Sequence, residues 1–298
     1  MKDMDNASGL VEVGETASSG KWFLIFFVSF VILCGLYIPS LYAAGLNEQQ
    51  TANKISVAEY ILSGGCDNVL IGSSLLHTVR PEYFRTLHVC NLALPGSSAA
   101  TGMKILESLE RTPKIIIVEI NAFRPVSKEL VDLAEVWPTT LRNFKLRAEL
   151  NKLNPALTSK AERERQKQRY VELQRGADDL VAGAPSDEKN LLMKQGKDQE
   201  VLSAPAEVVD LLSEHAQFSR VMEKRGASVF FVCLPLAISS AGACYLPALE
   251  KIIPGHSIRL SLDYGDMRWI DSHHFDYRSA AIYARKLEEY LTNNKIAK

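Results

Sequence analysis

A serine and an Asp-His pair that lies far downstream of it in the sequence could together transfer an acyl group. Asp271 precedes His274 by three residues, on a stretch that leads into a strongly helical C-terminal segment. A carboxylate at this spacing can orient an imidazole and stabilise its charged form, which prepares the histidine to act as a general base. Ser74, in a Gly-Ser-Ser turn far upstream, is the best candidate for the nucleophile that such a base needs. The sequence therefore raises the hypothesis of a Ser-His-Asp triad.

Each of these motifs also has an ordinary structural explanation. A Gly-Ser-Ser turn after a strand is often only an N-cap, and an Asp before a helix can be the same. Ser74 does not lie in the Gly-x-Ser-x-Gly elbow of α/β-hydrolases, because Leu76 replaces the second glycine. Taken alone, such a turn is more often an N-cap than a nucleophile, but a serine directly after a buried strand has backbone N–H groups around its hydroxyl, and these suit an anion or a developing oxyanion.

Alternating apolar runs, turns and helical stretches predict the scaffold that would position these residues. Short apolar runs of the kind that form buried parallel strands occur at 68–71, 88–94, 114–120 and 229–235, with a weaker one at 258–262. The last helix is expected at about 278–291. The alternation indicates one α/β domain over 67–298 with a mainly parallel sheet, whose ligand face is formed by the loops that follow the strands.

A helical insertion is expected to interrupt this alternation at about 127–225. The stretch is rich in Leu, Glu, Lys, Arg and Gln and has almost no strand signal. Apolar residues between Val208 and Met222 recur at helical spacing, so we expect the last helix of the insertion to pack on the sheet. The charged run 162–169 fits a solvated helix face, and a basic surface for an anionic polymer is the alternative.

The N-terminal part of the chain predicts a membrane anchor. Residues 1–21 are polar and expected to be disordered, whereas 22–46 form an uncharged stretch long enough to cross a bilayer of about 30 Å, with aromatic residues at both ends. A cleaved signal peptide fits less well because the leading tail lacks a basic start, and a buried core helix is rarely so uniformly apolar. Residues 47–66 are interpreted as a linker with a neck helix at 51–62.

Composition and charge narrow the function classes. The 298 residues are 47% apolar and 23% charged, as in an ordinary globular protein, and a net charge of −1 gives no sign of nucleic-acid binding. The five cysteines form no metal-binding cluster, so we expect neither a metal nor a cofactor. Buried free thiols are the simplest interpretation of Cys34, Cys90 and Cys233. Cys66 and Cys244 lie in expected loops, and a disulfide involving one of them is open if the domain is exported.

Taken in order, four motifs resemble those of the SGNH (GDSL-like) hydrolase superfamily. They are Gly-Ser-Ser at 72–74, Asn-Leu-Ala-Leu-Pro-Gly-Ser at 91–97, Asn121 after the third expected strand, and Asp-x-x-His at 271–274. The likeness covers about 67–125 and 226–292, and it is closest to the membrane-anchored branch of D-alanyl-transfer and exopolysaccharide O-acetylation proteins. It implies a flavodoxin-like three-layer α/β fold. Ser73 departs from the pattern because many members have Asp there, and the third motif lacks its usual Gly and second acidic residue.

The resemblance also implies a role for each candidate residue. Ser74 would be the nucleophile, His274 would take its proton, and Asp271 would orient the imidazole. The three-residue spacing selects His274 over the adjacent His273 as the base. The oxyanion would be held by the N–H of Ser74, the N–H of Gly96 and the side chain of Asn121.

The function implied by the resemblance is that of a membrane-tethered serine esterase or acyltransferase acting on acylated cell-envelope or extracellular polysaccharide. Its expected partners are the acylated glycan, a membrane acyl-transfer protein, and the membrane itself through residues 22–46. The expected location is the bacterial inner (cytoplasmic) membrane, single-pass, with the catalytic domain facing the periplasm or exterior. The alternative is a non-catalytic SGNH-like protein that binds polysaccharide or serves in assembly.

Overall fold

The computed structural model describes residues 25–31, 48–135, 137–153, 160–184, 205–237, 244–271 and 273–296. These belong to two units, Met1–Gln50 and Thr51–Lys298. In the first unit, residues 25–31 are helical, while the tail at 1–21 and most of the predicted anchor at 22–46 lie outside the described residues. Within the part of the chain that the structure describes, no helix is both long and apolar enough to span a membrane.

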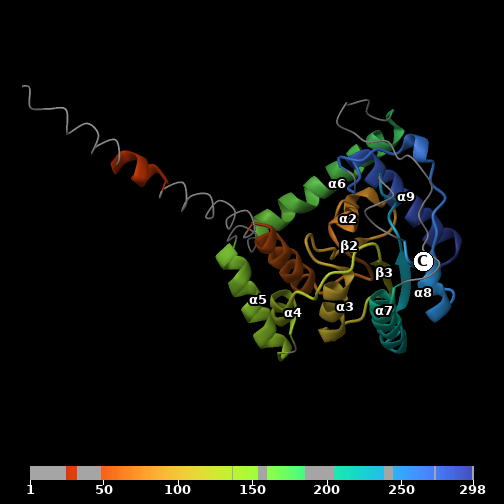
Figure 1. The fold of residues 1–298 in the computed structure, drawn as a ribbon, viewed down its shortest axis with the longest axis horizontal. Coiled ribbons are helices and arrows are strands. Elements are labelled where there is room, and N and C mark those ends of the chain that lie inside the picture. The colour runs from red at the N-terminus through yellow and green to blue at the C-terminus, as the bar shows by residue number, and fades with distance from the viewer. Residues whose placement is uncertain are drawn as a thin grey trace, which may run out of the picture. The chain divides into compact units, whose positions relative to one another are not determined.

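The second unit is built on a five-stranded parallel sheet (Figure 1). The strands are β1 (Asn68–Ile71), β2 (Val89–Asn91), β3 (Ile115–Glu119), β4 (Ser228–Val232) and β5 (Ser257–Ile258). Their spatial order is β2-β1-β3-β4-β5, which is the order of flavodoxin-like sheets. The prediction of an α/β domain with a parallel sheet is therefore confirmed. The weak strand expected at 258–262 is only a two-residue strand that pairs with the end of β4.

Helices cover both faces of the sheet because each strand alternates its apolar side chains between the two sides. Val69 and Ile116 face a core formed with helix 51–62, α3 (Ala99–Ser108), α7 (Ala206–Lys224) and α8 (Leu246–Ile252). Leu70 and Ile117 face the opposite core, under α2 (Ser74–His77) and α9 (Tyr277–Asn293). In Figure 1, α3 and α7 lie on one side of the strands and α2 and α9 on the other.

Helix 51–62, which the sequence places between anchor and domain, contributes to the first of these cores. Val57, Ala58 and Ile61 are buried there. The Asn53 side chain donates from Nδ2 to the Pro95 carbonyl at 2.9 Å, beside the turn that contains Gly96. The helix therefore packs on the α/β unit over its length.

The described part of the insertion between β3 and β4 is mainly helical, as the composition indicates. It contains α4 (Lys128–Ala134), α5 (Thr139–Leu153), α6 (Lys160–Ala182) and α7. Leu212, Phe218 and Met222 of α7 are fully buried in the core on the sheet, so the expected packing of the last insertion helix is confirmed. The charged run 162–169 lies within α6.

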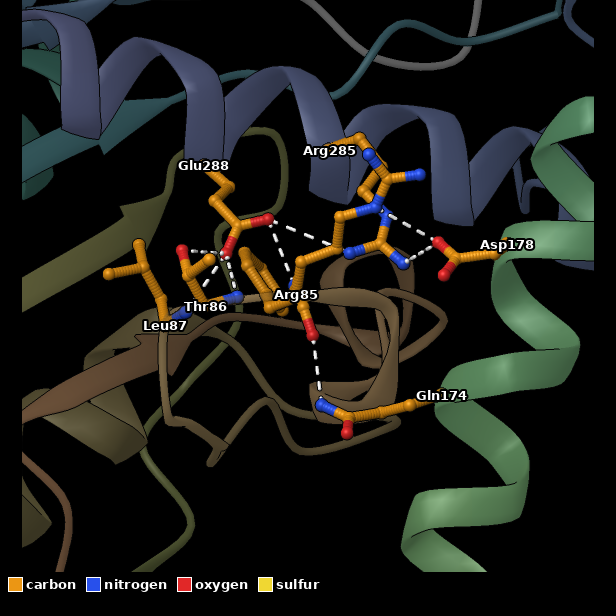
Figure 2. Close-up of polar contacts among 8 residues, drawn as sticks. Arg85, Thr86, Leu87, Gln174, Asp178, Arg285 and Glu288 are labelled. Carbon is orange, nitrogen blue, oxygen red and sulfur yellow. Dashed lines mark hydrogen bonds and ion pairs between the residues drawn. The ribbon is translucent and has the colours of Figure 1, made fainter.

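Polar contacts attach α6 to the rest of the domain on the α9 side (Figure 2). Gln174 donates from Nε2 to the Phe84 carbonyl at 3.1 Å. Asp178 accepts from Arg85 Nε at 3.0 Å and from Arg285 Nη2 at 2.7 Å. Sequence periodicity gives no indication of these contacts, because they join segments about a hundred residues apart.

The segment that α6 contacts is itself fastened to α9 by one carboxylate (Figure 2). Glu288 accepts from the backbone N–H groups of Arg85, Thr86 and Leu87 at 2.6–2.9 Å, and from the Thr86 hydroxyl at 2.8 Å. Partial burial raises the pKa of Glu288, but the hydrogen bonds from these donors outweigh it and hold the pKa below its usual value.

Four of the cysteines form two disulfides. Cys66 pairs with Cys90 across the starts of β1 and β2, and Cys233 pairs with Cys244, with Cα atoms 5.8 and 5.7 Å apart. The interpretation of Cys90 and Cys233 as buried free thiols is therefore wrong. Cys90 lies in β2 and meets Cys66 because β2 pairs with β1, whereas Cys233, directly after β4, meets Cys244 only 11 residues further along the chain. Cys34 lies outside the described residues.

Candidate active site

Ser74, His274 and Asp271 form one hydrogen-bonded chain at the carboxyl end of the sheet. Ser74 is the first residue of α2, directly after β1, and its Oγ lies 2.9 Å from His274 Nε2. His274 Nδ1 lies 2.7 Å from Asp271 Oδ2. A neutral imidazole with its proton on Nδ1 satisfies both contacts, donating to the carboxylate and accepting from the hydroxyl. These are the distances expected between a nucleophile, a base and the group that orients the base.

The loop that carries His274 is held by its own hydrogen bonds. Asp271 Oδ1 accepts from the backbone N–H groups of His273 and His274, both at 2.7 Å, and Ile270 N donates to the His274 carbonyl at 2.9 Å. Trp269 and Phe275 pair across the loop as an isolated antiparallel bridge, and both side chains are fully buried. The imidazole therefore projects from a loop anchored at both ends in the core.

The charge of Asp271 is strongly favoured. Partial burial raises its pKa, but the hydrogen bonds from the His274 side chain and from the backbone N–H groups of His274 and His273 outweigh this and lower the pKa to about 2. The side chains remain accessible, with exposed fractions of 31% for His274 and 52% for Asp271. The pair can therefore meet a substrate while the carboxylate stays ionised at any ordinary pH.

His273 meets this chain of contacts through its backbone. Its ring centroid lies 6.4 Å from that of His274, and its contribution to Asp271 is the backbone N–H. The three-residue spacing therefore selected the histidine that meets Ser74.

The turn containing Gly96 is joined to the turn containing Ser74. Leu94 N donates to the Gly72 carbonyl at 2.9 Å, which places the two turns side by side at the ends of β1 and β2. Gly96 has a φ of +75°, a conformation that a residue with a Cβ rarely adopts. Among the described residues, neither the Ser74 N–H nor the Gly96 N–H donates to another protein group. Both therefore remain available as oxyanion donors.

Asn121 has a different setting from the one that the resemblance implies. Its Nδ2 donates to the Leu234 carbonyl at 2.9 Å, and its Oδ1 accepts from the Leu234 N–H at 2.7 Å. The side chain thus ties the end of β3 to the segment after β4. The predicted oxyanion role depends on the second amide N–H alone.

Glu119 is a residue at this site for which no role is expected from its sequence pattern. It is the last residue of β3 and is fully buried. Its Oε2 accepts from Ser73 N at 2.6 Å and from Ser73 Oγ at 2.7 Å, and its Oε1 accepts from Asn121 N at 3.0 Å and Ala122 N at 3.1 Å. Burial raises the pKa of this carboxyl, and the hydrogen bonds oppose the rise. The available signal was an acidic residue inside a run that is otherwise apolar.

Asn91, at the end of β2, also fixes the turn. Its Nδ2 donates to the carbonyls of Leu76 at 3.0 Å and Val79 at 2.8 Å, and its Oδ1 accepts from Ala93 N at 2.8 Å. These bonds hold α2, and with it Ser74, against the neighbouring strand. Asn91 begins the Asn-Leu-Ala-Leu-Pro-Gly motif, which singles it out in the sequence. The motif does not indicate that Asn91 positions α2.

Within the described residues, no group of three or more His, Cys, Asp or Glu side chains is placed to hold a metal ion. The available chemistry at the sheet edge is that of a hydroxyl, an imidazole, a carboxylate and backbone N–H groups. No protein-family model, curated protein or solved structure matches this chain.

Proposed function

We propose that this protein is a serine esterase or acyltransferase of the SGNH type that acts on acylated polysaccharide of the cell envelope. The observation that carries the proposal is the contact of Ser74 Oγ with His274 Nε2 at 2.9 Å, together with the contact of His274 Nδ1 with Asp271 at 2.7 Å. Ser74 and His274 are two hundred residues apart in the chain. Helix capping alone gives no reason for the serine to meet that imidazole nitrogen.

The proposed reaction has two balanced halves. In the first, Ser74 Oγ bonds to the acyl carbon while His274 Nε2 takes the hydroxyl proton, and the oxyanion accepts from the N–H groups of Ser74 and Gly96. The ester C–O bond then breaks, and the leaving oxygen takes the proton from Nε2. In the second, the oxygen of water or of a sugar hydroxyl bonds to the acyl carbon and gives its proton to Nε2, the bond between the acyl carbon and Ser74 Oγ breaks, and Oγ takes the proton back from Nε2. The acceptor decides between hydrolysis and transfer.

The proposal that the substrate is a glycan is supported by the surface beside His274. Tyr277 begins α9, three residues after His274, and its side chain is 57% exposed. The Arg80 guanidinium lies 5.0 Å from the centre of the Tyr277 ring. Arg80 follows α2, so the two segments that supply the nucleophile and the base meet again at this pair. An exposed aromatic ring held in place offers an apolar face on which a sugar ring can stack.

We further propose that the domain is exported and tethered to the bacterial inner (cytoplasmic) membrane by residues 22–46. Two disulfides support an oxidising compartment, because such bonds persist outside the cytosol. The length and uncharged character of 22–46 support a spanning helix. A membrane acyl-transfer protein is the proposed source of acyl groups. A periplasm-active reporter fused after Lys298 is expected to be active, and activity of a cytoplasmic reporter instead would refute this orientation.

Labelling with a fluorophosphonate tests the catalytic proposal. We expect the full-length protein to be labelled and to hydrolyse p-nitrophenyl acetate, and both activities to be lost in Ser74→Ala and His274→Ala. His273→Ala is the matched control because it keeps the backbone N–H that Asp271 accepts, and it is expected to behave like the wild type. Equal labelling of folded Ser74→Ala, or a folded wild type with neither labelling nor hydrolysis, would sink the proposal. The latter result would favour a non-catalytic polysaccharide-binding or assembly protein.

A further inference from the structure

Glu119 joins two turns that lie at the carboxyl ends of neighbouring strands. One oxygen accepts from the N–H and hydroxyl of Ser73, and the other accepts from the N–H groups of Asn121 and Ala122, over distances of 2.6–3.1 Å. Three of these partners are N–H groups, which can only donate, so both oxygens must act as acceptors. A carboxyl group provides two acceptor oxygens, whereas the amide of glutamine provides one.

The fit around Glu119 leaves no spare room at the turn. A Cβ on Gly72 would lie 2.8 Å from both the Cβ and the Oε2 of Glu119, and 3.1 Å from the Cβ of Leu76. Glycine therefore allows the backbone before Ser74 to approach the carboxylate closely. The distance between β3 and the Gly-Ser-Ser turn is set by this contact.

Hydrogen bonds continue from Glu119 toward the loop that carries the base. Asn121, whose N–H meets Glu119, bridges to the backbone of Leu234 through its side chain. The next residue, Pro235, accepts from Trp269 Nε1 at 3.1 Å, and Trp269 pairs with Phe275 across the loop of His274. The turn of the nucleophile and the loop of the base are thus held by one connected set of buried contacts.

Stabilisation of the fold does not by itself explain why the carboxylate of Glu119 is buried here. A carboxylate that is 0% exposed is costly unless it is paired, and no ion pair of Glu119 with a cation is found among the described residues. Its four donors come from the residue before Ser74 and from the loop after β3. What the buried charge secures is therefore the geometry of the site.

We propose that Glu119 is a positioning residue for the reaction at Ser74. Its carboxylate fixes the Gly-Ser-Ser turn against the loop after β3, and so sets where the Ser74 hydroxyl meets His274. This inference rests on the proposed function, since it assigns the geometry that the nucleophile needs. Displacement of a reacting group by about 1 Å can cost on the order of a hundredfold in rate.

Glu119→Gln tests the inference, with Glu288→Gln as a matched control. Both carboxylates accept from three backbone N–H groups and one hydroxyl, but Glu288 holds the segment under α6 and not the turn of Ser74. In Glu119→Gln an amide NH2 faces donors, and we expect the second-order rate of fluorophosphonate labelling to fall about 10- to 100-fold. We expect labelling of Glu288→Gln to stay within about twofold of the wild type, since it lies outside the reacting groups.

Amide hydrogen exchange provides a second measurement that needs no catalysis. Faster exchange is expected at 72–76 and 119–123 in Glu119→Gln, and at 85–87 in Glu288→Gln. Wild-type labelling of Glu119→Gln, or equal slowing in Glu288→Gln, would overturn the positioning role while leaving Ser74 as the nucleophile. A wild type that is not labelled would instead refute the proposed function, and unchanged exchange in Glu119→Gln would still refute the fastening of the turn.

Ser73→Ala serves if Glu119→Gln does not fold. It removes the hydroxyl that donates to Glu119 and that also caps α2 by accepting from Leu75 N at 3.2 Å, and it keeps the backbone N–H. Slower labelling by about 3- to 10-fold with a wild-type KM for p-nitrophenyl acetate is the expected result, since one of the four contacts is lost. A wild-type labelling rate in folded Ser73→Ala would overturn the inference.

Discussion

Glu119 and Glu288 each accept from three backbone N–H groups and one hydroxyl in two regions of the domain, and their pKa values shift in opposite directions. Glu288 also lies 3.7 Å from Arg285 Nη1. For Glu119, burial raises the pKa more than the hydrogen bonds lower it. For Glu288, partial burial raises the pKa less than the hydrogen bonds lower it. The contrast indicates that complete burial without a neighbouring cation among the described residues makes the charge of Glu119 costly, whereas the exposed edge of Glu288 and the nearby Arg285 help it to stay ionised. The carboxylate at the candidate active site is the costly one, and the carboxylate that fastens the segment under α6 is the stabilising one.

A third carboxylate extends the comparison and carries the largest expected effect. Asp271→Asn keeps an oxygen for the N–H groups of His273 and His274, but its amide cannot accept from His274 Nδ1. The wrong imidazole tautomer is then favoured, and we expect kcat for p-nitrophenyl acetate to fall about 10³- to 10⁴-fold with little change in melting temperature. A loss below tenfold would contradict the assignment of Asp271.

The same carboxylate predicts the acid side of the pH profile. Because the pKa of Asp271 is lowered to about 2, the group stays ionised as the pH falls through the usual carboxyl range. We expect no loss of kcat attributable to Asp271 above about pH 3, since protonation occurs only near the lowered value. A comparison of the pH profiles of the wild type and Asp271→Asn measures this, and a carboxyl-dependent limb near pH 4 would contradict it.

Two glycines test how tightly each region is packed. Gly72→Ala would crowd Glu119, and we expect it to lower the free energy of unfolding by about 1–3 kcal/mol and to slow labelling of Ser74. Gly176 lies inside α6, and a Cβ there meets nothing within 4 Å. Gly176→Ala is expected to raise the free energy of unfolding by about 0.5–1 kcal/mol. Urea denaturation measures both changes in the free energy of unfolding. An unchanged free energy of unfolding in Gly72→Ala would show that the turn at Gly72 is not tightly packed.

Opposite pKa shifts predict opposite pH dependence for the two glutamates. The lowered pKa of Glu288 means that its contribution to stability is present above the ordinary value of 4.5 and is lost as the pH falls through the folded-state pKa. The raised pKa of Glu119 means that its ionised form is penalised above the folded-state pKa, and the penalty disappears below 4.5. Glu288→Gln should therefore cost more at neutral than at acidic pH, about 1–3 kcal/mol at pH 7. Glu119→Gln should lower the free energy of unfolding less at neutral than at acidic pH. Urea denaturation from pH 4 to 8 measures both losses, and the same pH dependence of the loss in the two variants would contradict the contrast.

The smallest expected effect concerns the substrate surface beside the site. Tyr277→Ala should raise KM for an acetylated polysaccharide about 3- to 10-fold, the loss of one aromatic contact, and leave hydrolysis of p-nitrophenyl acetate unchanged. Phe144 in α5 is a matched control because its ring is 73% exposed on another part of the domain. An equal rise in KM for Phe144→Ala would show that Tyr277 has no special role.

Local pattern predicted much of the scaffold. Runs such as Ile115–Glu119 are apolar except for their last residue, short and bounded by turns, so the strands and the parallel sheet follow from local sequence. Ser74, His274 and Asp271 were recognisable because their types and local motifs indicate chemistry before any distance is known. The helical insertion followed from composition in the same way.

Contacts between segments that are distant in the chain could not be predicted from local sequence pattern. Glu119 meets Ser73 across 46 residues, and Glu288 meets Thr86 across 202, and neither separation has a periodicity that a sequence displays. Cys90 has the apolar neighbours of a buried thiol, and only the pairing of β1 with β2 places it against Cys66. Asn121 was assigned by analogy, and the position of Leu234 gives it other bonds.

The disulfide between Cys66 and Cys90 encloses Ser74 in a covalent ring. A protease that cuts after lysine and arginine, but not before proline, releases Ser74 on the fragment 55–85 and Cys90 on the fragment 86–104. Without reduction these two fragments stay joined, so a probe attached to Ser74 should be recovered at their combined mass. With reductant the labelled species should shift to the mass of 55–85 alone. The shift on reduction therefore assigns the labelled residue to the fragment that contains Ser74.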